Sequence, residues 1–269
     1  MTGSVMIKIP GGRVRVGSDV HYPEERPAHE IETKPFWIDR TAVTNAAFAE
    51  FVAATRWVTT AERPERPGSL VFHMSSGPVD LHDPRQWWSF VSGASWRCPE
   101  GPGSDLEGRD DHPVVHVSKH DALAYASWRG VRLPDEWEWE AACRGGLFGA
   151  SYAWGNTFDS EQANIWIGAF PWYFARGEKP GTCAVDRHPA NGYGLVGMIG
   201  NVWEWTSSDF AGDTCCGAAA AKGAVLTSLR GGSYLCAAEY CLRYRPAARI
   251  GQEAATTTGH IGFRCAQDD

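Results

Sequence analysis

The chain has 269 residues, of which 43% are hydrophobic and 21% charged, a composition typical of a soluble globular protein. Its net charge is −7 and Lys and Arg are scattered, which argues against binding to nucleic acid or to an anionic membrane. The eight cysteines include no C-x2-C pair, so neither a disulfide scaffold nor a zinc ribbon is expected. No stretch has the features of a signal peptide or a membrane span, and we expect a cytoplasmic protein.

The N-terminal part is predicted to be largely extended. Residues 6–17 alternate around a Gly-Gly pair and predict a β-hairpin. Residues 27–44 are again strand-like, with a break at Pro35. Thr44 is a suitable N-cap, and the apolar side chains of residues 45–55 fall on one face, which predicts a helix.

The middle of the chain is less regular. Residues 56–111 show little periodicity and are rich in Pro, Gly, Ser and Trp, which is typical of a long loop that forms part of a cleft wall. Residues 112–118 predict a short buried strand. Capping residues then predict helices over residues 119–129 and 135–144, the second with a capping box at its start and a glycine at its end.

Beyond residue 146 no helical period recurs, and short apolar runs separated by Gly, Pro and Asn predict strands and structured loops. Residues 217–221 (GAAAA) are expected to form a surface loop. No linker or internal repeat is present in the sequence. We therefore predict one α+β domain over residues 1–269.

Two cysteines, Cys236 and Cys241, lie five positions apart in the turn-rich segment 231–249. The residues alone leave three interpretations open: a structural disulfide, two inert buried thiols, or a site for a soft metal such as Cu(I), which favours thiolates. Three arginines of the same segment would lower the thiol pKa values and favour the thiolate form.

The chain resembles the formylglycine-generating enzymes, the oxidases that mature sulfatases. The motifs that carry the resemblance run in family order along nearly the whole chain: WRCPEGPGSD (96–105), HPVVHVS (112–118), RLPDEWEWEAACRGGL (132–147), ANIWIGAFP (163–171), NGYGL (191–195), GNVWEW (200–205), GGSYLC (231–236) and GFRC (262–265). The paired cysteines are the most specific of these motifs. The resemblance implies a variant of the C-type lectin fold, with low regular secondary structure and many structured loops.

On this resemblance Cys236 and Cys241 would hold one Cu(I) ion, with Ser233 and Tyr240 as catalytic residues beside them. The substrate would be a sulfatase polypeptide with a Cys-x-Pro-x-Arg motif, whose cysteine supplies a third thiolate. Dioxygen would be reduced at the metal with the help of a reductant, and the substrate thioaldehyde would hydrolyse to Cα-formylglycine. We expect a monomer.

The resemblance also implies a substrate cleft that Trp203, Arg245 and His260 help to form. His260 stands where active enzymes usually have Asn, beside the copper pocket. An imidazole is bulkier than an amide and titrates near neutral pH, so this position is the main departure from the family.

Structural calcium is the second implied metal, since backbone carbonyls, carboxylates and amides are its usual ligands. The implied ligands form two sets, Asn164, Ile165 and Glu178 in one, and Gly200, Val202 and Glu204 in the other. Gly197 stands where the family has a side-chain oxygen for the second set. From the residues alone, turn caps are the favoured interpretation of Asn164 and Glu204.

The other cysteines and the histidines carry weaker signals. Some relatives join the positions of Cys143 and Cys265 in a disulfide, which a reducing compartment disfavours. The adjacent cysteines 215–216 are expected to be surface thiols. The histidines spaced by four within residues 112–120 lie in a predicted strand and are predicted to be structural.

The rival interpretation is a non-catalytic module on the same scaffold that presents a Trp-rich cleft to a peptide or a glycan. Its binding would survive the loss of both paired cysteines. A non-haem iron oxidase is a weaker alternative, because it would need a separate His-rich helical domain for which this chain has no room.

Overall fold

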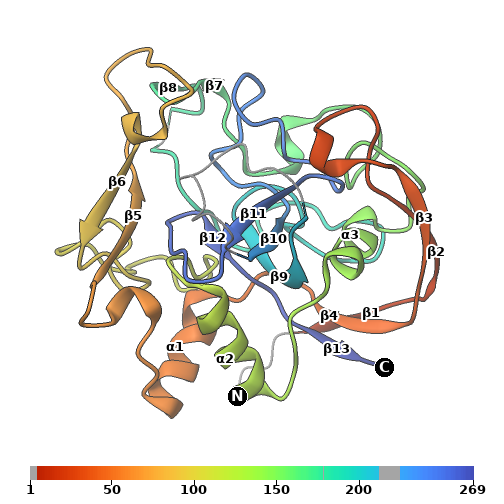
Figure 1. Cartoon of the computed structure of the whole chain (residues 1–269), viewed down its shortest axis with the longest axis horizontal. Helices are drawn as coiled ribbons and strands as arrows, with labels where there is room; N and C mark the ends of the chain where they lie inside the picture. The colour runs from red at the N-terminus through yellow and green to blue at the C-terminus, as the bar shows by residue number, and fades with distance from the viewer. Residues whose placement is uncertain (1–4, 178, 212–224) are drawn as a thin grey trace.

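Short strands and irregular loops make up most of the chain, and the helices lie at its periphery and around one central sheet (Figure 1). The computed structural model describes residues 5–177, 179–211 and 225–269. Its helices are α1 (Asn45–Thr55), α2 (Lys119–Arg129) and α3 (Glu136–Arg144), with 3-10 turns η1 (Pro23–Glu25), η2 (Thr60–Glu62), η3 (Pro84–Gln86) and η4 (Ser160–Gln162). The predicted α+β class, with little regular secondary structure, is confirmed. None of the described helices is long and apolar enough to cross a membrane.

The central sheet has the strand order β11-β10-β9-β12. Its strands are β9 (Trp203–Asp209), β10 (Leu226–Arg230), β11 (Arg249–Glu253) and β12 (Ile261–Gly262). The first three pair antiparallel, whereas β12 runs parallel to β9. The parallel pairing brings His260 next to Trp203, whose N–H donates to the His260 carbonyl at 2.9 Å. This sheet therefore places two of the predicted cleft residues, Trp203 and His260, side by side.

The remaining strands form smaller sheets around the centre. A three-stranded sheet joins the two ends of the chain in the order β1-β4-β13. Its strands are β1 (Met6–Ile9), β4 (Phe36–Asp39) and β13 (Ala266–Asp268). Three two-stranded pairs complete the set: β2 (Gly12–Val16) with β3 (His29–Thr33), β5 (Gly68–Phe72) with β6 (Trp88–Ser92), and β7 (Gly168–Ala169) with β8 (Tyr173–Phe174). Figure 1 shows β2–β3 and β5–β6 on opposite sides of the molecule.

The predicted hairpin over residues 6–17 is wrong. Both of its strands form, but β1 pairs with β4 and β2 pairs with β3. The two strands separate at Gly12, whose φ of +136° is a conformation that residues with a Cβ rarely adopt. The alternation of apolar and polar residues over 6–17 belongs to two strands that each pair with a different partner. The Gly-Gly pair marks the point where the chain passes from one strand pair to the other.

The predicted strand over residues 112–118 is also wrong. This buried segment makes only an isolated bridge, between Pro113 and Thr44. His116 has a φ of +59°, which breaks the extended backbone. The loop predicted for residues 56–111 likewise contains the β5–β6 pair, whose apolar positions carry no clear alternation.

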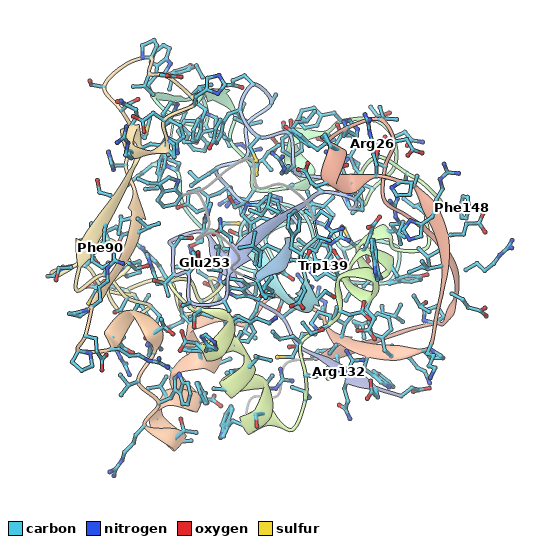
Figure 2. All side chains as sticks on the ribbon, in the orientation of Figure 1. Arg26, Phe90, Arg132, Trp139, Phe148 and Glu253 are labelled. Carbon is cyan, nitrogen blue, oxygen red and sulfur yellow. The ribbon has the colours of Figure 1, made fainter. Side chains whose placement is uncertain are left out.

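The three helices begin and end where the sequence places them. Asp135 caps α3, accepting hydrogen bonds from the N–H groups of Trp137 and Glu138 at 2.8 Å each. Gly145 ends the same helix with a φ of +58°. Helix α3 directs Trp139 into the centre of the molecule (Figure 2), where the indole is fully buried. These caps fix the two ends of α3, which packs against β9 and β10 of the central sheet.

Candidate active site

A tight turn brings the two paired cysteines together. The Cys236 N–H donates to the Ser233 carbonyl at 2.9 Å, and the Cys241 N–H donates to the Ala237 carbonyl at 2.8 Å. The two Sγ atoms are then 3.2 Å apart. Both residues are buried, with exposed fractions of 2% and 5%. These local backbone hydrogen bonds bring the two sulfurs close together.

The two cysteines are not joined by a disulfide in the structure. A disulfide would require an S–S distance of about 2.05 Å, well below the distance observed. Two sulfurs this close could bind one soft ion, and thiolates are the donors that Cu(I) prefers. Within the described ranges no group of three His, Cys, Asp or Glu side chains could hold a metal. The two sulfurs present fit a soft ion that takes two protein thiolates.

Ser233 and His260 lie directly beside this pair. The fully buried Ser233 donates its N–H to Cys236 Sγ at 3.4 Å. Its hydroxyl is 3.2 Å from Nδ1 of His260, and either atom can be the donor. Burial, reinforced by the nearby His116, lowers the pKa of His260 to about 3. The imidazole is therefore neutral at physiological pH and acts as a hydrogen-bond partner of Ser233.

Aromatic side chains surround the cysteine turn. The Tyr240 ring stacks on Phe170 with centroids 4.6 Å apart and meets the edge of Trp87 at 5.2 Å. Trp88 packs at 4.8 Å against His260. The Cys236 carbonyl accepts a hydrogen bond from the Trp166 N–H at 3.1 Å, which ties the turn to the aromatic cluster. These flat, stiff rings give the site rigid walls.

The whole chain, residues 1–269, matches the family described as the sulfatase-modifying factor enzyme 1-like domain. The chain belongs to this family. It is 49% identical to the formylglycine-generating enzyme of Mycobacterium tuberculosis, over 98% of this chain and 97% of the relative. It is 45% identical to the enzyme of the same name from Streptomyces coelicolor, over 97% and 88% of the two chains. A mouse relative named an inactive Cα-formylglycine-generating enzyme is 40% identical over 97% of this chain and 85% of its own.

Solved structures show the same fold at lower identity. PvdO from Pseudomonas aeruginosa is 23% identical with a TM-score of 0.65, over 98% of this chain and 94% of its own. CarF is 20% identical with a TM-score of 0.63, over the full length of both chains. Since the family also contains relatives named inactive, membership leaves the chemistry to be argued from the site.

Two predicted cleft residues of the family are less accessible than expected. Trp203 is only 2% exposed and belongs to the same buried apolar cluster as the paired cysteines. Arg245 is 2% exposed, and its guanidinium is bonded to the Glu25 carboxylate at 2.7 Å and 2.5 Å. The neighbouring Arg243 and Arg249 are likewise paired with carboxylates. All three arginines of the segment are therefore compensated by carboxylates, and their effect on the paired thiols stays a prediction.

A small cavity of about 70 Å³ adjoins the site. Its lining includes His116, Tyr234 and Gly259. Tyr234 directly follows Ser233 in the sequence, and Gly259 directly precedes His260. The Glu100–Arg109 ion pair, 2.7 Å long, lies at its lining.

His116 is a functional candidate that the sequence interpretation missed. It is fully buried, its Nδ1 lies 2.7 Å from Ser69 Oγ, and burial lowers its pKa to about 4. The positive φ noted above is a strained conformation that persists only when its surroundings enforce it. Its spacing from other histidines carried no signal, because the informative property is a backbone angle.

The second calcium set does not fit calcium in this structure. Both Glu204 oxygens are bonded by Arg264, at 2.7 Å and 2.8 Å, and one of them also accepts from Trp139 Nε1 at 2.7 Å. Arg264 further donates to the Gly197 carbonyl at 3.3 Å. A protein cation therefore already balances the carboxylate that calcium would need.

The first calcium set stays a prediction. An isolated parallel bridge joins Asn164 to Gly200, and the Asn164 carbonyl accepts from the Asn201 N–H at 2.8 Å. Asn164 Nδ2 donates to the Gly181 carbonyl at 2.9 Å. Ile165 is buried beside it, whereas Glu178 lies outside the described residues.

Of the remaining predictions on cysteines, the structure bears on the Cys143–Cys265 disulfide and not on the surface thiols at 215–216. Cys143 and Cys265 are both buried free thiols, so the disulfide seen in some relatives is not formed in the structure. Burial raises both of their pKa values well above the usual range. The surface thiols 215–216 and the loop 217–221 fall outside the described residues.

Proposed function

We propose that the chain is a copper-dependent oxidase that converts the cysteine of a Cys-x-Pro-x-Arg motif in sulfatases to Cα-formylglycine, using dioxygen. The observation that carries the proposal is the pair of buried cysteine sulfurs 3.2 Å apart, not joined by a disulfide and with Ser233 in contact. The relatives named formylglycine-generating enzyme support the same reaction and substrate class. Two thiolates with no third ligand side chain grouped beside them among the described residues suit Cu(I) better than zinc, which takes three or four protein ligands.

Copper, when bound, supplies the one-electron chemistry by which dioxygen is activated. The chain would hold the ion with Cys236 and Cys241. The backbone N–H of Ser233, donated to Cys236 Sγ, favours the thiolate over the thiol. The neutral His260 holds the Ser233 hydroxyl in one orientation beside the pair.

The overall reaction is balanced as follows. The substrate Cβ–H and Cβ–S bonds break, an aldehyde C=O forms with oxygen from water, and the sulfur leaves as sulfide. Oxidation of the cysteine to the aldehyde level releases two electrons, and an external thiol reductant supplies two more. These four electrons and four protons reduce one dioxygen to two waters, one of which balances the water used in hydrolysis.

The cavity beside Tyr234 and Gly259 is the route by which we expect the substrate peptide to approach. Tyr234 and Gly259 of its lining adjoin Ser233 and His260 in the sequence, and Ser233 contacts both His260 and Cys236 Sγ. Tyr240, fixed by Phe170, would then limit the conformations open to the substrate cysteine. Holding reacting groups in one geometry is the main contribution that a protein makes to such a reaction.

The proposal also includes a structural calcium ion at Asn164 and Ile165, a monomeric state and a cytoplasmic location. Each has a direct measurement. A chelator should lower the melting temperature if the Asn164 set binds calcium, light scattering gives the mass in solution, and fractionation gives the location.

The decisive experiment is anaerobic titration with Cu(I), followed by mass spectrometry of a Cys-x-Pro-x-Arg peptide after dioxygen is admitted. We expect one Cu(I) per chain and a product that has lost sulfur and gained oxygen. Cys236→Ser and Cys241→Ser should abolish both, whereas Cys183→Ser, at a lone thiol elsewhere, should leave both unchanged. Turnover that persists in either paired-cysteine variant would sink the proposal.

The second candidate is a non-catalytic peptide- or glycan-binding module, which the relative named inactive favours. It predicts that the peptide binds equally well to the parent chain and to a Cys236→Ser, Cys241→Ser double variant, without product. The same samples therefore separate the two functions.

A further inference from the structure

A segment of the N-terminal region lies over the second half of the cysteine turn. This segment, residues 17–28, contains η1 and is called the N-terminal strap below. In Figure 1 the 3-10 turn η1 lies in the connection between β2 and β3, and it contacts β11. Its residues Tyr22 and Glu24 contact Leu242 and Arg243, which lie more than 200 positions further along the chain.

Two buried ion pairs join the strap to the residues that follow Cys241. Arg243 donates to Glu24 Oε1 from Nε at 3.2 Å and from Nη2 at 2.5 Å. Arg245 is bonded to both carboxylate oxygens of Glu25. The exposed fractions of these four side chains are all 7% or less. In such a setting each arginine requires its carboxylate, because an unpaired buried charge is costly.

Tyr22 adds a third connection between the strap and the turn. Its hydroxyl accepts a hydrogen bond from the Leu242 N–H at 3.2 Å. The guanidinium of Arg243 lies over its ring, 3.5 Å from the centroid, a favourable cation–π geometry. The residue directly after Cys241 is therefore held at its backbone and the next one at its side chain.

The strap itself is fixed at its base. The Gly17 N–H donates to Glu140 Oε1 of α3 at 2.9 Å, and Arg144 pairs with the same carboxylate. The Ser18 N–H donates to the Glu25 carbonyl at 3.0 Å, which closes the strap into a loop. The strap can thus transmit the position of α3 to the cysteine turn.

The coupling reaches Cys241 through the backbone. The Arg243 N–H donates to the Cys241 carbonyl at 2.7 Å, and Arg245 Nε donates to the Leu242 carbonyl at 3.0 Å. Cys236 is held differently, by the Ser233 turn and by Trp166. Of the two sulfurs, only the one on Cys241 sits on a stretch that the strap restrains directly in the described structure.

We propose that Tyr22, Glu24 and Glu25 are positioning residues for the metal-binding thiol pair. By holding residues 242–245, the strap sets the separation of the two Sγ atoms and so the affinity of the pair for Cu(I). This inference rests on the proposed function, since it assigns a purpose to the same thiol pair. Outer groups that orient metal ligands commonly contribute about 10–100-fold to metal affinity.

A purely structural role for the strap makes a different prediction. It would lower stability when the contacts are removed, but the folded fraction would bind Cu(I) normally. Affinity measured well below the melting temperature therefore distinguishes positioning from support. The reactivity of the thiols without metal gives an independent readout of the same geometry.

The test compares Tyr22→Phe and Glu24→Gln with the parent chain and with Asp39→Asn. Asp39 lies on β4, outside the central sheet, and forms an ion pair with Arg129 at 2.8 Å. Asp39→Asn therefore removes one buried ion pair away from the cysteine turn and is the matched control. Cu(I) affinity is measured anaerobically against a chromophoric chelator, and the rate of Cys236–Cys241 disulfide formation is measured in the metal-free chains with a mild oxidant.

We expect both strap variants to bind Cu(I) about 10-fold or more weakly and to show an altered disulfide rate, while the Asp39 variant matches the parent. Strap variants that stay within about twofold of the parent in both measurements would overturn the proposal. Tyr22→Phe keeps the assay informative if Glu24→Gln fails to fold. If the parent binds no Cu(I), the proposed function fails, and the disulfide rate alone decides whether the strap positions the pair.

Discussion

The ion pair between Glu204 and Arg264 should be a stability element that does not depend on calcium. Both residues are fully buried, at 1% and 0% exposed, and both Glu204 oxygens accept hydrogen bonds from Arg264. Glu204→Gln keeps the size of the side chain but removes its charge. One oxygen becomes an amide N–H₂ group that faces the guanidinium.

The size of the effect follows from what remains in the structure. Arg264 still donates to backbone carbonyls, so its hydrogen bonds are only partly lost, but its charge is left without a counter-ion. Removing one partner of a buried pair costs about 3–5 kcal/mol, which is a large part of the stability of a domain. The bond from Trp139 Nε1 survives only if the amide oxygen takes its place.

Urea denaturation of the parent chain and of Glu204→Gln, each with calcium and with a chelator, measures this cost. We expect the variant to lose about 3–5 kcal/mol in both conditions, because Arg264 is present in both. A parent chain that falls to the stability of the variant when the chelator is added would refute the reasoning. In that case the carboxylate would serve calcium, and the bond to Arg264 would be secondary.

Three further predictions concern stability. Lowering the pH from 7 to 5 should cost about 2 kcal/mol through His116, whose pKa of about 4 lets the unfolded chain bind a proton that the folded chain does not; His116→Gln should reduce the pH dependence of urea unfolding without removing it, because His260, with a pKa of about 3, acts in the same direction. Gly200→Ala should lower stability by about 1–3 kcal/mol, since φ is +77° and a Cβ would lie 2.4 Å from the Asn164 carbonyl oxygen; an unchanged melting temperature would contradict this. Asp135→Ala should cost about 1 kcal/mol through the lost cap, measured against Ala at an exposed position of the same helix.

Local signals in the sequence predicted what local interactions determine. The three helices follow from caps and from apolar spacing within a dozen residues, and the structure places them at those bounds. The hairpin over residues 6–17 failed because strand pairing is decided by distant partners. The strand over residues 112–118 failed because a positive φ at His116 leaves no mark in the hydrophobic pattern.

The candidate site shows the same division. The spacing of Cys236 and Cys241 fitted a turn, and the turn brings the sulfurs together with local hydrogen bonds. The roles expected for Arg245 and Glu204 could not be weighed from the sequence, because their partners are 220 and 60 positions away. A buried arginine requires a carboxylate, but the sequence offers 32 acidic residues and does not say which one meets it.

The long-range attachment of the cysteine turn also bears on how the protein is made. Its supporting contacts join residues 22–25 to residues 242–245, and β13 at the end of the chain pairs with β4 near its start. Such contacts carry a large loop-closure entropy and form late in folding. During synthesis these supporting contacts of the thiol pair can therefore form only after residues 242–245 have left the ribosome. A nascent chain would present two cysteines but no ordered metal site, which delays metal capture until the fold can control it.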